Sequence, residues 1–145
     1  MNHLTLLLLH LFAAFIFVGT VFFEVLMLEG IRQRVPRESM RSVEVAIGQR
    51  ARKFMPFVII VLYGAGITMA WQYRAVLASP FSSTFTIMLW LKIVLALSVL
   101  VHFVTAIRLS ATHRLTAKHF KYIHLSVFLH MLAIVFLAKA MFYLH

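Results

Sequence analysis

The chain contains no cysteine, and this absence excludes several kinds of chemistry. Without thiols there is no disulfide, no thiolate metal site, no iron–sulfur ligation and no covalent haem attachment through a C-x-x-C-H motif. Charged residues are also scarce, at 12% of the chain, and only four residues are acidic. The chain has no phosphate-binding glycine loop, internal repeat or low-complexity tract. Any metal or cofactor ligands must therefore come from other side chains.

Hydrophobic residues fill the chain instead, making up 63% of its 145 residues, against about 45–50% in an ordinary soluble domain. A soluble fold of this size cannot hide so much apolar surface, so lipid is the expected solvent. Four apolar runs, each long enough to cross roughly 30 Å of hydrocarbon at ~1.5 Å per residue, occupy about 4–28, 54–73, 85–107 and 122–144. We therefore predict an all-α fold, a polytopic membrane four-helix bundle, with residues 1–145 forming a single membrane domain.

The basic residues predict the orientation of these helices. Seven lie between the first and second runs and four between the third and fourth, whereas the loop between the second and third has only Arg74. Positively charged loops stay in the cytoplasm, so loops 29–53 and 108–121 are predicted to be cytoplasmic and both termini periplasmic, in a bacterial inner membrane. Topology thus accounts for the net charge of +10, and no nucleic-acid partner is expected.

Residues 37–53 allow three interpretations. They form a cytoplasmic continuation of the second helix, an amphipathic helix on the lipid surface that meets lipid phosphates, or a solvated linker helix.

Ionisable side chains inside the bilayer cost roughly 2.5–3.5 kcal/mol each even on insertion scales, so each needs a reason. Three lie within ~8–10 Å of the outer face, namely His10, Lys92 and Lys139. Four lie in the inner half, namely Glu24, His102, His124 and His130. His124 and His130 are separated by about 120° around their helix and are not expected to face one centre.

Histidines on facing helices can hold haem b, because neutral imidazoles supply axial nitrogens from both sides of the macrocycle. The predicted inner pair is His102 with His130, or His102 with His124. Three glycines lack the side chains that would block a flat macrocycle, although close helix packing also explains them; they are Gly19, Gly64 and Gly66.

The outer layer leaves several roles open. His10 has no histidine at its own depth within the chain, so its partner is a second protomer or a neutral Lys92. Otherwise Lys92 and Lys139 pair with haem propionates or an anionic substrate, or reach the outer headgroups. For a lone membrane histidine, an interhelical hydrogen bond is the simplest explanation.

A bare metal site is the alternative to haem. Glu24, His102 and either His124 or His130 offer carboxylate and imidazole ligands that suit zinc, iron or copper(II). The methionines show no M-x-x-M spacing for copper(I), and core filling explains them better. Because the carboxylate and imidazole ligands suit copper(II), copper is kept as the alternative cofactor.

The order of these features resembles a known membrane superfamily. His10 opens the segment His10-Leu11-Phe12-Ala13-Ala14, the basic stretch 50–53 leads into Phe54-Met55-Pro56, and Leu91-Lys92-Ile93 is followed by His102. This pattern resembles the superfamily of copper-resistance D-type proteins and HemJ-type protoporphyrinogen oxidases. The resemblance implies haem b binding, with the first-helix histidine and third-helix lysine of the HemJ-type proteins at His10 and Lys92.

Two stretches depart from the HemJ-type pattern. Phe22, Phe23 and Glu24 stand where those proteins carry an arginine late in the first helix. The fourth helix opens with residues 122–125, Tyr-Ile-His-Leu, in place of an Asn-Glu-x-Pro-like stretch. These departures and the additional histidines favour a haem-binding relative with a different task.

The function predicted from the sequence is a membrane haem b protein that moves electrons within the bilayer, with a quinol, a porphyrinogen or a small oxidant as its partner. The alternatives are a copper or other metal transport protein, a HemJ-like protoporphyrinogen oxidase, and a purely structural subunit. A bundle this small is a candidate for a homodimer, although no motif specifies the interface.

Overall fold

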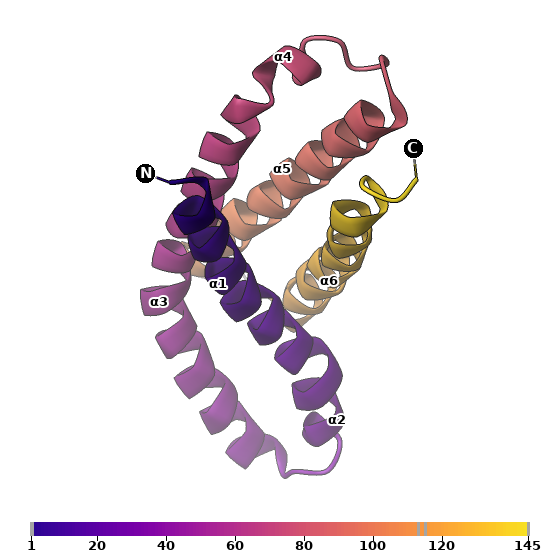
Figure 1. Ribbon diagram of the computed structural model, residues 1–145. Coiled ribbons are helices and arrows are strands. Elements are labelled where there is room, and N and C mark those ends of the chain that lie inside the picture. The colour runs from indigo at the N-terminus through magenta and orange to yellow at the C-terminus, as the bar shows by residue number, and fades with distance from the viewer. Residues whose placement is uncertain (1, 113, 115, 145) are drawn as a thin grey trace. The chain divides into compact units, whose positions relative to one another are not determined.

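The computed structural model describes residues 2–112, 114 and 116–144, and in these residues all regular structure is helical (Figure 1). Four helices are long and apolar enough to cross a membrane: His3–Arg32, Arg37–Gln72, Thr84–Ala111 and Lys118–Ala140. This confirms the all-helical prediction and the four helices of spanning length. In the most apolar stretch of each helix no more than 22% of the residues are buried. Few side chains in these stretches are therefore fully buried, as expected of helices that face lipid.

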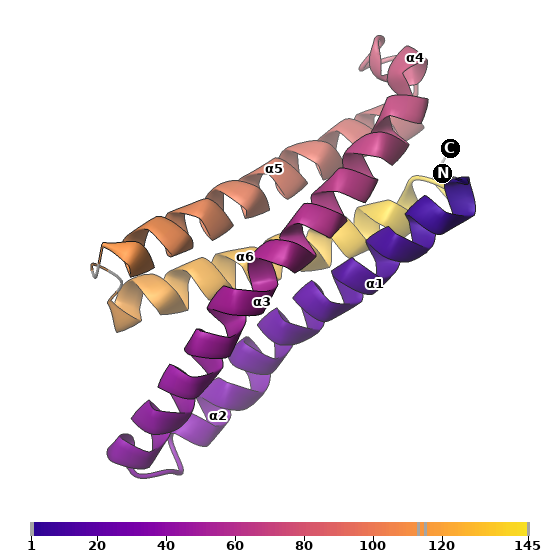
Figure 2. The same ribbon diagram turned by 90° about the vertical axis from the view of Figure 1, so that its left-hand side faces the viewer.

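The chain forms two compact units, Met1–Trp71 and Gln72–His145, each built on two long helices. The first unit holds α1 (His3–Phe22), η1 (Phe23–Leu28), α2 (Glu29–Arg32) and nearly all of α3 (Arg37–Gln72). The second holds α4 (Arg74–Leu77), α5 (Thr84–Ala111) and α6 (Ala117–Ala140). The long helices that follow one another in each unit run in opposite directions (Figure 2).

The first helix changes its hydrogen-bonding pattern before it ends. Phe23–Leu28 form a π-helix that joins α1 to α2 without interrupting the rod, and Glu24 lies in its first turn. Short π-helical segments are rare and frequently occur at functional sites. No residue pattern in the sequence predicted this one.

The second long helix begins much earlier than its apolar run. α3 has 36 residues, or about 54 Å at ~1.5 Å per residue, well beyond the ~30 Å of a hydrocarbon core. Residues 37–53 are thus a continuation of the helix, the first of the three interpretations, and the connection to α2 shrinks to residues 33–36. Pro56 lies inside α3, where it has no N–H to donate to the Arg52 carbonyl.

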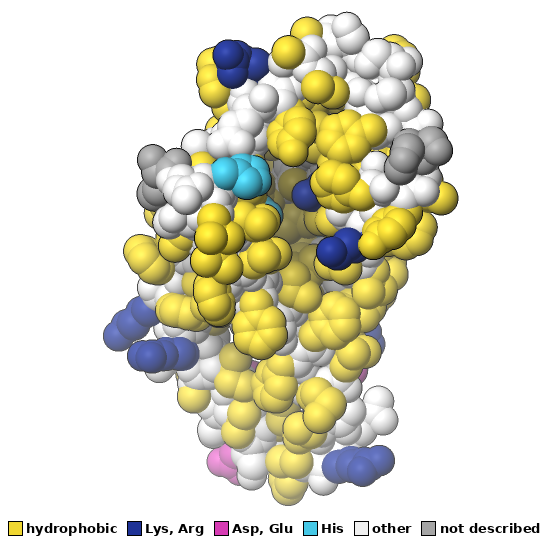
Figure 3. All heavy atoms as spheres, in the orientation of Figure 1, with side chains coloured by type: hydrophobic (Ala, Val, Ile, Leu, Met, Phe, Trp, Pro, Cys, Tyr) yellow, Lys and Arg dark blue, Asp and Glu magenta, His cyan; other side chains and the backbone are white. Residues whose placement is uncertain are grey.

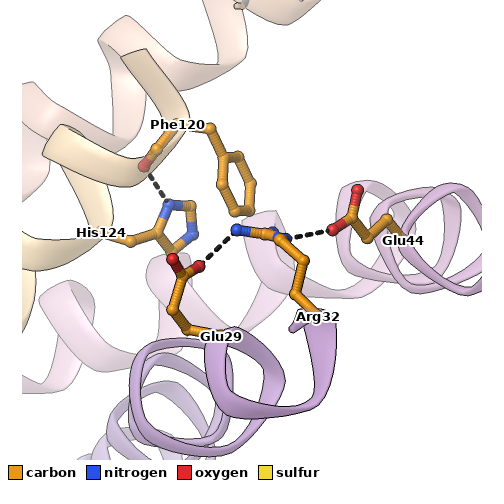
Figure 4. Close-up of polar contacts among 5 residues, drawn as sticks. All are labelled: Glu29, Arg32, Glu44, Phe120 and His124. Carbon is orange, nitrogen blue, oxygen red and sulfur yellow. Dashed lines mark hydrogen bonds and ion pairs between the residues drawn. The ribbon is translucent and has the colours of Figure 1, made fainter. Parts of the chain in front are cut away.

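An ion-pair cluster joins α2 to α3 across this short connection. The Arg32 guanidinium donates to Glu29 on α2 and, at 2.7 Å, to Glu44 on α3 (Figure 4). The three side chains are only about a third exposed, at 34–36%.

In the second unit, side-chain caps set where the long helices begin. Ser83 accepts from the Thr86 backbone N–H at 3.2 Å to start α5, and Thr116 accepts from the His119 N–H at 3.2 Å to start α6. Near the start of α5 Trp90 donates to the Leu77 carbonyl at 3.2 Å and so ties α5 to α4. α5 and α6 pack side by side along their length (Figures 1 and 2).

Candidate functional site

The polar centre of the second unit is a pair of histidines, each with a serine one helical turn earlier. Ser98 and His102 lie on α5, and Ser126 and His130 lie on α6. Residues four apart share a face of a helix, so each serine lies beside its own histidine. All four side chains are half-buried, and the imidazole centroids are 5.5 Å apart with ring planes at 53°.

The hydrogen bonds of these four residues are reciprocal. His102 Nδ1 lies 2.7 Å from the Ser98 carbonyl, and His130 Nδ1 lies 2.7 Å from the Ser126 carbonyl. Each Nε2 lies 3.0 Å from the serine hydroxyl of the opposite helix, Ser126 for His102 and Ser98 for His130. We call Ser98, His102, Ser126 and His130 the Ser–His cluster.

The partners determine which ring nitrogen of each histidine in the Ser–His cluster carries the proton. A carbonyl oxygen can only accept, so Nδ1 must be the donor, and in a neutral imidazole Nε2 is then the acceptor. The serine hydroxyls consequently donate across the helix pair. Interhelical hydrogen bonds inside a membrane contribute on average ~0.6 and at most ~1.7 kcal/mol each, so the cluster joins α5 to α6.

His124 has different surroundings from His130. Its Nδ1 donates to the Phe120 carbonyl at 2.9 Å, and its ring lies over the Phe120 ring with centroids 3.9 Å apart (Figure 4). The structure therefore brings His102 together with His130 and places His124 against Phe120, one turn earlier on α6.

His10 is held between α1 and α3 in the first unit by a hydrogen bond and by contact with a glycine. Its Nδ1 donates across from α1 to the Leu62 carbonyl on α3 at 2.9 Å. A Cβ added at Gly66 would stand 3.2 Å and 3.3 Å from two atoms of the imidazole ring. A Cβ leans toward the preceding turn of its helix, so a side chain at 66 would crowd the carbonyl that His10 uses. Gly66 therefore admits both the ring and its hydrogen bond.

The other two glycines proposed to leave space are different from Gly66. A Cβ added at Gly19 or Gly64 would meet no described atom within 4 Å. Close packing against a neighbouring described side chain is thus seen at Gly66 alone of the three.

The remaining predicted site residues are dispersed. Lys92 is half-buried in the first third of α5, Lys139 is exposed in the last turn of α6, and Glu24 is half-buried in η1. The exposure of Lys139 suits an ammonium that reaches a membrane surface. His10 and Lys92 belong to different units, and their pairing stays a prediction.

Within the described residues no three His, Cys, Asp or Glu side chains come together as a metal-binding group. The bare-metal site of Glu24 with two histidines thus gains no support from the structure. The two serines of the Ser–His cluster were not among the predicted site residues. The signal that points to them is the repeated Ser-x-x-x-His spacing on two successive helices.

Comparison with known proteins adds no relative, because no family model, curated protein or solved structure matches this chain. The resemblance to the copper-resistance D-type and HemJ-type superfamily stays a prediction. The candidate site is accordingly defined by its own geometry.

Proposed function

We propose that this chain is a multi-pass protein of the bacterial inner membrane that binds haem b and moves electrons within the bilayer. One observation carries the proposal. Four histidines of the long apolar helices, His10, His102, His124 and His130, each hold Nδ1 on a backbone carbonyl at 2.7–2.9 Å.

That bond prepares an imidazole for ligation. A histidine that binds a metal is commonly oriented by an Nδ1–H bond to a carbonyl, which leaves Nε2 as the coordinating nitrogen. The donor set therefore fits a haem iron, for which histidine is a common axial ligand. Haem supplies one-electron chemistry at the site, while the protein supplies ligands, orientation and an apolar surrounding.

His10 is the ligand that the geometry favours. Its ring is held by a carbonyl on the opposite helix and packs on Gly66, so little rotational freedom remains. A ligand fixed in advance loses less entropy on binding. The resemblance implies the same residue, together with Lys92.

The inner histidines carry an additional requirement. In the Ser–His cluster each Nε2 accepts a hydrogen bond from a serine hydroxyl at 3.0 Å. Either nitrogen can therefore coordinate iron only after the serine side chain has rotated away. A macrocycle between His102 and His130 would also have to part α5 from α6. We therefore place the first haem at His10 and treat the inner pair as a separate question.

The direct test is absorption spectroscopy of the detergent-purified protein, oxidised in air and then reduced with dithionite. A Soret band that shifts on reduction, a resolved α band and a positive pyridine haemochrome assay are expected. His10→Ala should remove most of the bound haem. His119→Ala, an exposed histidine at the start of α6, is the matched control and should retain it.

Other outcomes separate the alternatives. A colourless protein after expression with ample haem would overturn the haem proposal, and metal in that sample would favour copper or other metal transport. Turnover of protoporphyrinogen to a fluorescent porphyrin would favour the HemJ-like oxidase, whereas quinol-dependent haem reduction supports electron transfer. Full haem retention in His102→Ala would show that the inner histidine pair does not ligate haem.

A further inference from the structure

A shallow hollow on α3 is lined largely by basic side chains. It has a volume of about 570 Å³ and is lined by Ala46, Gln49, Arg50, Arg52 and Lys53. Three of its five lining residues are cations, and Gln49 adds an amide donor. Lys and Arg side chains stand out from the left-hand edge of the molecule over α3 (Figure 3).

The helix itself brings these groups together. Gln49 and Arg50 lie three and four residues after Ala46, and Lys53 lies four and three residues after them, so the four share one face of α3. Small Ala46 leaves that face open between the longer side chains. Arg52 flanks it and turns back along the helix, with a guanidinium nitrogen 4.0 Å from where a Cβ on Gly48 would stand.

The hollow lies where the apolar part of α3 begins. From residue 54 onward the helix has no charged side chain, and residues 37–53 are rich in charge. Arginine and lysine at such a boundary lie at the level of lipid phosphates. The cations therefore meet the bilayer surface at which α3 enters the membrane.

The same helix face continues into an exposed apolar stripe. Phe54, Phe57 and Ile60 follow Lys53 by one, four and seven residues, and their side chains are 41%, 67% and 70% exposed. A molecule with a phosphate head and acyl tails matches this sequence of surfaces, with the head on the cations and the tails along the phenylalanines. A free phosphate would contact only the cations and not the apolar stripe.

We propose that this hollow binds the headgroup phosphate of an anionic phospholipid, with Arg50, Arg52 and Lys53 as its cationic ligands. The site is independent of haem, because it rests on α3 alone. An anionic lipid bound here holds α3 at a fixed depth, since the phosphates cannot follow the helix into hydrocarbon.

The test is native mass spectrometry of the intact protein in a neutral detergent, titrated with phosphatidylglycerol and with phosphatidylcholine of the same acyl chains. Retention of phosphatidylglycerol over phosphatidylcholine is expected. Arg50→Gln, Arg52→Gln and Lys53→Gln should each weaken phosphatidylglycerol binding about fivefold, the effect of one basic residue near an anionic lipid surface. Arg41→Gln, a cation on the same helix outside the hollow, is the matched control and should change it little.

Two further measurements decide what the site recognises. Phe57→Ala should weaken lipid binding without changing any binding of inorganic phosphate, because only the acyl chains meet that residue. If inorganic phosphate binds as tightly as the lipid and displaces it, the hollow is an anion site and the lipid proposal is wrong. Equal lipid retention by the three glutamine variants and Arg41→Gln would also overturn it. Circular dichroism of each variant confirms that the helices are retained.

Discussion

At the scale of the residue, several polar side chains in these helices form hydrogen bonds with the backbone of their own helix. The hydroxyls of Thr68 and Thr105 donate to the carbonyls of Gly64 and Val101, four residues earlier, at 2.8 and 2.7 Å. In the described chain no buried side-chain nitrogen or oxygen lacks a partner. His10 differs because its carbonyl partner lies on another helix. Such a bond depends on the residue that keeps that carbonyl accessible.

Gly66→Ala should destabilise the protein even though alanine is the better helix former. The helix gains about 0.8–1 kcal/mol from the substitution, but crowding against a held ring costs about 1–3 kcal/mol. We expect a lower unfolding midpoint in a titration with denaturing detergent. In a His10→Ala background the loss should disappear, because the ring that the methyl group crowds is gone.

The matched control is Gly64→Ala, two residues earlier on α3. Its Cβ meets no described atom within 4 Å, so only the gain in helix propensity applies. An unfolding midpoint equal to or above that of the unchanged protein is expected. Equal losses at 64 and 66 would contradict a specific contact between Gly66 and His10.

At the scale of the element, the Ser–His cluster fixes the register of α5 against α6. Because each serine donates to the histidine of the other helix, sliding one helix by a turn would break both cross-helix bonds together. Hydrophobic contacts between two uniformly apolar helices specify register less sharply, since lipid tails are as apolar as leucine.

Ser98→Ala should cost ~0.6–1.7 kcal/mol, the range for interhelical hydrogen bonds in membranes. The loss should shrink when His130 is already replaced by phenylalanine, because the two side chains share one bond. Thr105→Val on the same helix is the control and should be near neutral, since that hydroxyl donates to the Val101 carbonyl of its own helix. Full additivity of Ser98→Ala and His130→Phe, measured by unfolding midpoints, would exclude the cross-helix bond.

The ion pairs of Arg32 with Glu29 and Glu44 should contribute less to the free energy of unfolding than their short distances imply. Arg32 bonds two carboxylates, but its side chain and theirs are about a third exposed, so water and salt screen the attraction. Arg32→Gln is expected to cost about 0.5–1 kcal/mol at low salt. The difference in unfolding midpoint from the unchanged protein should narrow as salt is raised to ~1 M, where the Debye length is ~3 Å.

At the scale of the whole molecule, the absence of cysteine makes the topology directly measurable. Single cysteines at Asn2 and Leu144 should react with an impermeant maleimide from the periplasmic side of intact cells. A cysteine at Ser42, in the charged half of α3, should react only after the cells are opened. The reverse pattern would show that the positive loops do not lie in the cytoplasm.

Much of the architecture was predictable, because bilayer thickness alone relates apolar run length to helix number. The four apolar runs lie within the four long helices, and α3 also includes the charged residues 37–53. The beginning of α3 was left open, since residues 37–53 suit a continuous helix, a surface helix or a linker equally well in hydropathy. Backbone continuity selected the first.

The candidate site was predictable only as a set of residue types at given depths. Depth follows from counting along a helix, so His10, His102 and His130 were identified as intramembrane groups. Depth does not say which way a side chain points or what it meets. The serines that accompany His102 and His130 were therefore missed, as was the π-helical turn around Glu24.

The sequence by itself determined the helical class of this protein, the number of helices long enough to span a membrane and the positions where polar groups enter the apolar helices. These depend on composition and on length along one axis. Only the tertiary structure decided the pairings: His10 with the Leu62 carbonyl over Gly66, and each inner histidine with the serine of the other helix. The physical reason is that a hydrogen bond needs direction and separation within a few tenths of an ångström. Those depend on the rotation of one helix against its neighbour, which no spacing along a single chain specifies.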